Sequence, residues 1–379
     1  MKLVVQVKLL PTPQQAAALE ATLDAVNRAA NLVAALAFQR RCFRNFDRRR
    51  HAYDQIKAEF GLAAQAAQHV IKKVADAYRT LHANLAAGSL GGPGSRRLKA
   101  EAKPVSFRPL AAQPYDDRCL SWQHEARTVS IWTTGGRLKG VAFTGSEEHL
   151  ALLAAHRRGE SDLVCRDGMW FLHATIEVPD VPAAAPEGFL GVDLGIANIA
   201  TTSDGVRRSG RGLNAVRHRH RALRRRLQAR ATKSAKRLLK RRRRKEARFA
   251  AGTNHVIAKQ IVTEAERTGR GIALEDLQGI RERVRLRKPQ RVTLHAWSFH
   301  QLGSFISYKA ARAGVAVIHV DPSYTSQQCS QCGHVDRRNR PGQATFSCTS
   351  CGFAEHADVN AARNIASRGD TGWAVSHAA

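Results

Sequence analysis

Three short segments each place a carboxylate at the end of a predicted strand or at the start of a predicted helix. They are GVDLG around Asp193, ALEDL around Glu275 and HADVN around Asp358. Ligands of α/β sheets bind at the carboxyl ends of strands, so acids in these places are positioned to meet. Each acid taken alone could equally be a turn former, a helix cap or a surface charge.

The chemistry of the three acids follows from their mutual repulsion. Clustered carboxylates need a counter-charge, and Mg²⁺ or Mn²⁺ supplies it through oxygen ligands. Two such ions about 3.5–4 Å apart activate a water molecule and stabilise the leaving oxygen of a phosphodiester. Asp193, Glu275 and Asp358 are therefore candidate catalytic residues and ligands of two Mg²⁺ or Mn²⁺ ions in a phosphodiester hydrolase.

A second constellation is formed by four cysteines in two C-x-x-C pairs. Fifteen residues separate Cys329 and Cys332 from Cys348 and Cys351, and a glycine follows each pair. This spacing is typical of a zinc ribbon, whose four thiolates leave no open metal position. We expect one structural Zn²⁺ rather than four free thiols in a loop. The ribbon lies between Glu275 and Asp358 in the sequence, so its folding would help to place Asp358.

Two polar residues, Asn360 and Arg363, follow Asp358 at helical spacing. They could face the scissile phosphate or support the active site, and equally they could only cap or pair locally. Asp276 and Asp321 also end predicted strands, and we interpret them as turn-forming or supporting acids. The sixteen histidines form no convincing set of metal ligands.

The charge of the chain indicates a polyanionic partner. It carries 61 Lys and Arg against 31 Asp and Glu, a formal net charge of +30, although 43% hydrophobic residues allow a real core. Between Arg207 and Arg248 there are 20 basic residues and one acid, Glu246. Such a run is often only a solvated face, but so many like charges favour contact with nucleic acid.

The sequence also bears on the cellular compartment. No stretch approaches 18 uninterrupted apolar residues, and the start is too short and interrupted for a signal peptide. Cys42, Cys119 and Cys165 are scattered and do not suggest a disulfide framework. We therefore expect a cytoplasmic, reduced protein that associates with the nucleoid.

The predicted elements fall into two halves. A strand at 2–9 precedes a helix that Thr12 and Gln15 would cap, and a second helix runs through Val70 to Leu81. Strands dominate residues 104–178, followed by a Pro/Ala-rich linker. The second half alternates strands and helices, which indicates an α/β layered fold. Its expected elements are strands at 189–193, 199–202, 271–274 and 315–320, a basic helix or helical hairpin, and helices at 297–313 and 359–366.

The motifs, in their order along the chain, resemble those of the TnpB family of transposon-encoded RNA-guided nucleases, which are related to compact type V CRISPR effectors. The similar segments are GVDLGIAN from Gly191, LEDL from Leu274, TSQQCSQCGH from Thr325 and HADVNAARNI from His356. The resemblance covers essentially the whole chain. It implies an α/β RNase H-like (RuvC) nuclease domain with an inserted zinc ribbon, plus an N-terminal wedge β-barrel with an inserted helical recognition unit.

The resemblance also implies boundaries, ligands and partners. We expect the wedge at 1–10 and 96–180, the recognition unit at 11–95, the nuclease domain at 187–321 and 354–368 with a basic insertion at 212–268, the ribbon at 322–353, and a tail at 369–379. The partners implied are a transposon-derived guide RNA and target double-stranded DNA, cut next to a short DNA motif. A miniature CRISPR effector, a nuclease-dead guided repressor and a guide-free zinc ribbon DNA-binding protein are the alternatives.

Overall fold

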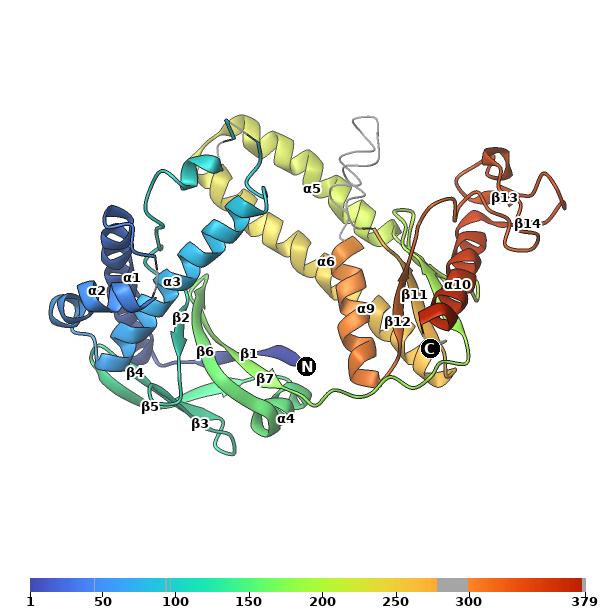
Figure 1. Ribbon diagram of the computed structural model, residues 1–379. Helices are drawn as coiled ribbons and strands as arrows, with labels where there is room; N and C mark the ends of the chain where they lie inside the picture. Colours follow the sequence, from blue (N-terminus) through green and yellow to red (C-terminus); the bar gives the residue numbers. More distant parts are fainter. Residues whose placement is uncertain (44, 93, 96, 278–298, 377–379) are drawn as a thin grey trace. The chain divides into compact units, whose positions relative to one another are not determined.

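The computed structural model describes all residues except 44, 93, 96, 278–298 and 377–379 (Figure 1). The chain divides into two compact units, Met1–Pro179 and Asp180–Ala379. The division falls in the predicted Pro/Ala-rich linker. No helix among the described residues is both long enough and apolar enough to cross a membrane.

The first unit is built on an antiparallel sheet in the order β2-β6-β7-β1-β5-β4-β3. The strands are β1 (Lys2–Leu10), β2 (Gln113–Tyr115), β3 (Leu120–Gln123), β4 (Thr128–Thr133), β5 (Gly136–Thr144), β6 (Arg157–Arg166) and β7 (Met169–Glu177). The N-terminal strand thus lies between β5 and β7, and it joins the later strands as the sequence indicates. Asp167 and Gly168, both with positive φ, form the predicted turn between β6 and β7.

The helices of the first unit pack on this sheet into one core. They are α1 (Pro13–Gln39), α2 (Asn45–Phe60), α3 (Ala64–Ala86), the short η1 (Leu98–Ala100) and α4 (Glu147–His156). Thr12 and Gln15 cap α1 reciprocally, as predicted. The sequence pattern indicated two long helices before residue 95, and α2 is a third. The sequence of α2 is mostly polar, and Ala52 and Ile56 are its fully buried apolar residues among those described. The helix therefore shows no apolar stripe from which the sequence could predict it.

The second unit has a five-stranded sheet in the order β10-β9-β8-β11-β12. The strands are β8 (Phe189–Asp193), β9 (Asn198–Thr202), β10 (Arg207–Ser209), β11 (Gly271–Glu275) and β12 (Val317–Val320). β8, β11 and β12 run parallel, so their carboxyl ends lie at one edge of the sheet. Both faces of a parallel sheet must be covered, which explains the unbroken apolar runs of β8 and β11.

Helices cover the two faces. The helices are α5 (Arg211–Arg230), α6 (Lys233–Arg267), α9 (Phe299–Ala313) and α10 (Ala357–Ser376). Leu190 and Val192 of β8 belong to the core that α6 and α9 close, whereas Phe189 shares a core cluster with Ile365 of α10. Figure 1 shows α9 and α10 on opposite sides of β11 and β12. The predicted start of α9 at Trp297 lies outside the described residues.

The last helix is longer than the sequence pattern indicated. α10 runs to Ser376, so the segment expected as a tail from residue 369 is helical as far as that residue. Gly369 packs so tightly that an added Cβ would lie 2.7 Å from Ala273 Cβ. The Trp373 ring lies 5.7 Å from that of Phe189. The close approach at Gly369 and Ala273 involves small residues, which leave no apolar periodicity to detect in the sequence.

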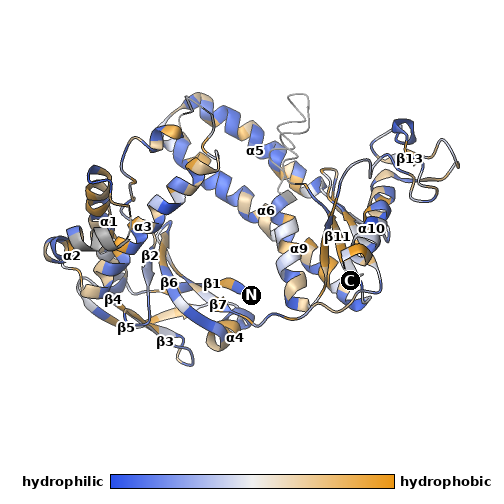
Figure 2. Ribbon diagram, viewed as in Figure 1, coloured by the Kyte–Doolittle hydropathy of each residue, from blue (hydrophilic) through white to orange (hydrophobic). Residues whose placement is uncertain are grey.

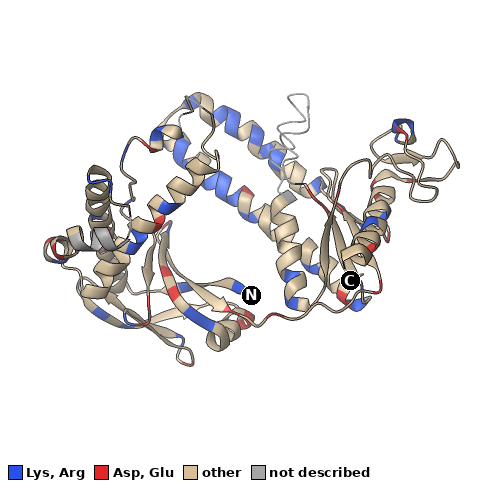
Figure 3. Ribbon diagram, in the orientation of Figure 1, with Lys and Arg blue, Asp and Glu red and all other residues tan. Residues whose placement is uncertain are grey.

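The basic run forms a helical hairpin of α5 and the first half of α6 (Figure 3). Ala231, with φ of 51°, ends α5, and the Thr232 side chain caps α6. Glu246, the one acid of the run, accepts from His220 Nδ1 at 3.1 Å and from Arg224 Nη2 at 3.3 Å, which ties the helices together. Figure 2 shows α5 largely hydrophilic, in contrast to β11.

Candidate active site

The sheet brings the three predicted acids to one edge. Asp193 is the last residue of β8 and Glu275 the last of β11. Val192 pairs with Leu274 across the parallel strands, so the two acids follow as neighbours. Asp358 stands in the first turn of α10, which packs against both strands.

Neighbouring side chains hold two of the acids. Asn198 Nδ2 donates to Asp358 Oδ2 at 2.9 Å, and Thr325 Oγ1 donates to Glu275 Oε1 at 2.6 Å. The Arg340 guanidinium lies 3.5 Å from Asp358 Oδ1. Asn198 and Thr325 stand inside the motifs singled out above, although the sequence assigned them no role. Arg340 stands outside those motifs, and no sequence signal marked it.

The charges at this edge are not balanced by the chain. Burial, followed by the charges of Glu275 and Asp358, raises the pKa of Asp193 to about 8, and Arg340 opposes the rise. Burial also raises the pKa of Glu275, against the hydrogen bond from Thr325. A cation among the carboxylates would remove the penalty for their ionised forms, and hard oxygen donors fit Mg²⁺ or Mn²⁺.

The spacing of the acids bears on how they could hold cations. Two groups of three or more potential metal ligands among the described residues have all their ligand atoms within 4.8 Å of one another. They are the four cysteines, and the group of His69, Asp116 and Cys119. The acidic trio is spread more widely than that. Such a spacing is compatible with more than one bound ion.

The raised pKa of Asp193 predicts how metal binding depends on pH. Up to about pH 8 the metal-free carboxyl holds a proton that Mg²⁺ must displace. The Mg²⁺ concentration for half-maximal activity should therefore fall as pH rises, by up to about tenfold per unit between about pH 6 and pH 8, and then level off. Mg²⁺ titrations of DNA cleavage across this range measure it. A half-saturating concentration independent of pH would contradict the prediction.

Gly191 sets how closely α10 approaches β8. A Cβ built on Gly191 would lie 2.0 Å from Ala362 O and 2.5 Å from Ala366 N, both in the backbone of α10. The helix that carries Asp358 therefore lies directly on the strand that carries Asp193. Only glycine permits this approach.

We expect Gly191→Ala to displace α10 and to move Asp358 away from Asp193. Overpacking of this kind costs roughly 1–3 kcal/mol or more in the free energy of unfolding, and we expect it to reduce nuclease activity strongly. Thermal unfolding and cleavage rates measure both effects. Gly212→Ala is the matched control, because Gly212 lies in α5 with nothing within 4 Å of an added Cβ. Equal behaviour of the two variants would contradict the packing role.

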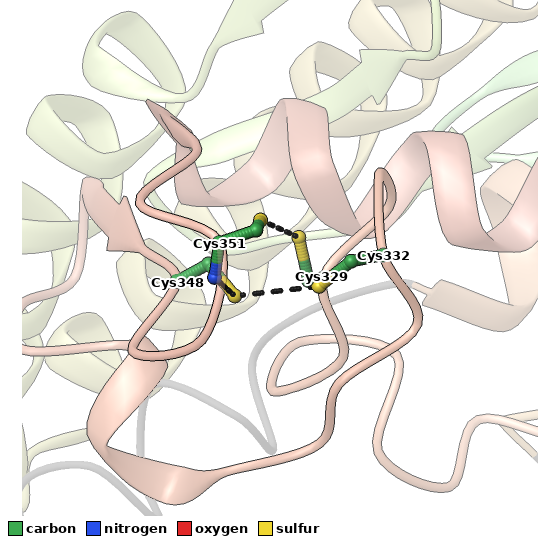
Figure 4. A group of neighbouring side chains, drawn as sticks. All are labelled: Cys329, Cys332, Cys348 and Cys351. Carbon is green, nitrogen blue, oxygen red and sulfur yellow. Dashed lines mark hydrogen bonds between the residues drawn. The ribbon is translucent and has the colours of Figure 1, made fainter.

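The four cysteines converge as a ligand set (Figure 4). Cys329 Sγ lies 3.7 Å from Cys351 Sγ, and Cys332 Sγ lies 3.6 Å from Cys348 Sγ. Thiolates about 2.3 Å from a tetrahedral zinc stand about 3.8 Å apart, so the geometry fits Zn²⁺. Gly333 and Gly352 have φ of 77° and 73°, and their amides bond back to Cys329 and Cys348.

Comparisons with known proteins identify this region. The model of the Cas12f1-like TNB domain matches residues 299–365, which include the four cysteines and Asp358. The Cas12f1 endodeoxyribonuclease of Sulfoacidibacillus thermotolerans is 47% identical over 123 residues, 32% of this chain and 28% of that protein. The TnpB-like protein MJ0751 of Methanocaldococcus jannaschii is 38% identical over 112 residues, 29% of this chain and 40% of that protein. Residues 299–365 thus match a domain of Cas12f1-like proteins, and the chain is similar to both Cas12f and TnpB-like proteins.

Two further comparisons cover more of the chain. The putative RNA-guided DNA endonuclease InsQ of Escherichia coli is 27% identical over 223 residues, 53% of this chain and 54% of that protein. The matched part is thus well under two thirds of each of these curated relatives. The structure of Cas12f1 in a complex with sgRNA and target DNA aligns with a TM-score of 0.56 at 15% identity, covering 92% of this chain and 82% of that one. The chain therefore has the fold of a Cas12f effector.

Asn360 and Arg363 each pair with nearby residues and not with the acidic trio. Asn360 is fully buried, accepts from Ser330 N at 2.9 Å and donates to Gln328 O at 2.8 Å. Both partners belong to the first cysteine loop, so Asn360 ties α10 to the ribbon. Arg363 is 42% exposed and lies 3.4 Å from Glu355. Neither residue contacts the acidic trio among the interactions described.

The remaining candidate groups have local partners. Asp321 accepts from both the backbone N and the Oγ of Ser323, as a turn-forming acid does. In the first unit, Asp116 accepts from Gln65 Nε2 at 2.5 Å and from the backbone N of Cys119 at 3.2 Å. The first bond ties α3 to the loop after β2 and the second lies within that loop, which gives the group of His69, Asp116 and Cys119 a structural role.

Proposed function

We propose that this protein is an RNA-guided, metal-dependent endonuclease of the TnpB/Cas12f family and of transposon origin. It cleaves double-stranded DNA after guide RNA pairing next to a short DNA motif. The observation that carries the proposal is the set of Asp193, Glu275 and Asp358 at one sheet edge, with charge that the surrounding side chains do not balance. The names of the curated relatives, endodeoxyribonuclease and RNA-guided DNA endonuclease, support it.

The acids would act as ligands of two Mg²⁺ or Mn²⁺ ions. When bound, such ions activate water and stabilise the leaving oxygen of a phosphodiester. The chain itself supplies orientation. Asn198 fixes Oδ2 of Asp358, and Thr325 fixes Oε1 of Glu275, so neither carboxylate must reorganise when the substrate arrives. The Arg340 guanidinium adds a cation beside Asp358, suited to a phosphate oxygen.

The domain assignments are part of the same proposal. Residues 187–321 and 354–368 form the RuvC nuclease domain, and residues 322–353 form a ribbon whose cysteines hold one Zn²⁺. Residues 1–10 and 96–180 form the wedge, and residues 11–95 the recognition unit. Together these parts hold the guide RNA scaffold and the duplex of guide RNA with target DNA. RNA-guided nucleases recognise that duplex by its shape and not by its sequence.

The basic hairpin offers a surface for nucleic acid. Arg241 and Lys245 are exposed and lie four residues apart on α6, so they share a face. If both contact phosphates, the double variant Arg241→Gln, Lys245→Gln should flatten the slope of log affinity against log salt by up to about 1.4–1.8. Binding titrations at several salt concentrations measure it. Arg79→Gln with Arg127→Gln is the control, because both of those cations already pair with acids. An unchanged slope in the hairpin variant would contradict the contact.

Purification of the wild-type protein from cells that express its genomic neighbourhood tests the function. We expect one specific RNA to travel with the protein, and the RNA-bearing protein to cut DNA that matches part of that RNA. A guide-free DNA-binding protein would carry no specific RNA. A nuclease-dead repressor would carry the RNA and bind the target without cutting it. Either outcome would overturn the proposal.

A further inference from the structure

Tyr324 lies four residues after β12. Its backbone conformation and its exposed ring both differ from what the stability of the fold would favour. Its backbone has φ of 61°, a left-handed conformation in which an L side chain crowds the chain and glycine is preferred. Its side chain is 63% exposed. A large aromatic side chain in this conformation, with little burial in return, points to a role outside the core.

The loop around Tyr324 is held without the aromatic ring. Ser323 donates to Asp321 Oδ1 through its backbone N at 3.0 Å and its Oγ at 2.8 Å. The backbone N atoms of Gln327 and Gln328 both donate to Tyr324 O at 2.9 Å. Within the described part of the chain, no hydrogen bond or ring contact of the Tyr324 side chain is found. The ring is therefore presented on a loop that other groups make rigid.

The loop lies against the acidic site. Thr325, the next residue, is only 3% exposed, and its Oγ1 lies 2.6 Å from Glu275 Oε1. Asn364 Nδ2 donates to Thr325 O at 2.9 Å, which fixes the loop to α10, the helix that carries Asp358. One residue of the loop is thus buried on a proposed metal ligand, while the preceding residue exposes an aromatic ring.

A nucleobase is the ligand that suits such a ring. Where a single strand brings its phosphodiester to the three partly exposed acids, its bases are unpaired and can contact the neighbouring side chains. Aromatic side chains bind unpaired bases by stacking, whatever the sequence. We propose that Tyr324 is a positioning residue, a platform on which one base of the single strand stacks while the acids act on its backbone. This inference rests on the proposed nuclease function.

Three variants at this position separate stacking from folding. Tyr324→Gly suits the left-handed backbone and should keep or raise the melting temperature, whereas Tyr324→Ala keeps the backbone crowding. Both should lower the single-turnover cleavage rate of a guide-matched plasmid by roughly five- to a hundredfold, because both lose the stack. Tyr324→Phe keeps the stacking face and should cut nearly as the wild type does. Val375→Ala, at a 77% exposed apolar residue near the end of α10, is the control.

The possible outcomes distinguish a failure of the stacking platform from a failure of the proposed nuclease function. Wild-type cleavage together with an unchanged rate for Tyr324→Gly would overturn the stacking platform alone. A loss in Tyr324→Phe as large as in Tyr324→Gly would assign the effect to the hydroxyl and would also overturn it. Absence of guided cleavage by the wild type would overturn both proposals. A slow, fully stable Tyr324→Gly with an active Tyr324→Phe supports the platform.

Discussion

Asp193→Ala should abolish DNA cleavage while guide-directed DNA binding stays close to that of the wild type. The variant removes the acid whose pKa the charges of both Glu275 and Asp358 raise, and with it one of the three proposed metal ligands. We expect the cleavage rate to fall at least about a thousandfold, which corresponds to about 4 kcal/mol of transition-state stabilisation. Cleavage assays and binding assays with the same guide-matched DNA measure the two activities.

Binding should survive because base pairing and distributed cations hold the target, not the acidic site. Asp204→Ala is the matched control, because Asp204 follows the neighbouring strand β9 but pairs with Arg270. Equal loss of binding and cleavage in Asp193→Ala would assign Asp193 a structural role instead.

Cys348→Ser should remove the zinc and unfold much of the region that contains the ribbon. Structural zinc contributes about 10–16 kcal/mol to the folding of small zinc peptides, so three thiolates will not hold the ribbon as four do. The effect should reach the active site, because the ribbon leads through β14 (Ala354–His356) directly into α10 and Asp358. The loop around Cys329 is also bonded to Asn360.

Metal analysis should find about one zinc per wild-type chain and none in Cys348→Ser. Limited proteolysis should then cut the variant within the ribbon, and cleavage of DNA should be lost. Cys165→Ser is the control, because Cys165 is a partly buried residue of β6 in the other unit. A zinc-free wild type that is folded and active would contradict the structural role of the metal.

Local signals in the sequence were sufficient for the elements that position the acids. The apolar run ending at Asp193 and the one ending at Glu275 predicted β8 and β11, because strands buried on both faces are apolar throughout. Thr12 and Gln15 predicted the start of α1 because a capping box depends on four consecutive residues. The alternation of strands and helices predicted an α/β layered fold, and the structure adds that β8, β11 and β12 are parallel.

The sequence did not predict the contacts between segments that are far apart along the chain. Asn198 and Asp358 are 160 residues apart, and only the packing of α10 on the sheet brings them together. Arg340 reaches Asp358 from a loop of the ribbon, and a lone arginine on a chain this basic carries no signal. Asn360 likewise faces the ribbon rather than a phosphate, a direction that helical spacing alone could not supply.

Redirection of the cut by the RNA is the most direct test of a guided nuclease built on Asp193, Glu275 and Asp358. The RNA that travels with the protein is sequenced, its DNA-matching segment is rewritten, and plasmids that carry the old or the new target are offered to the complex. We predict that the wild type cuts only the plasmid that matches the rewritten guide, and that Asp193→Ala binds that plasmid without cutting it. A cut that ignores the guide, or cleavage that persists in Asp193→Ala, would contradict the account.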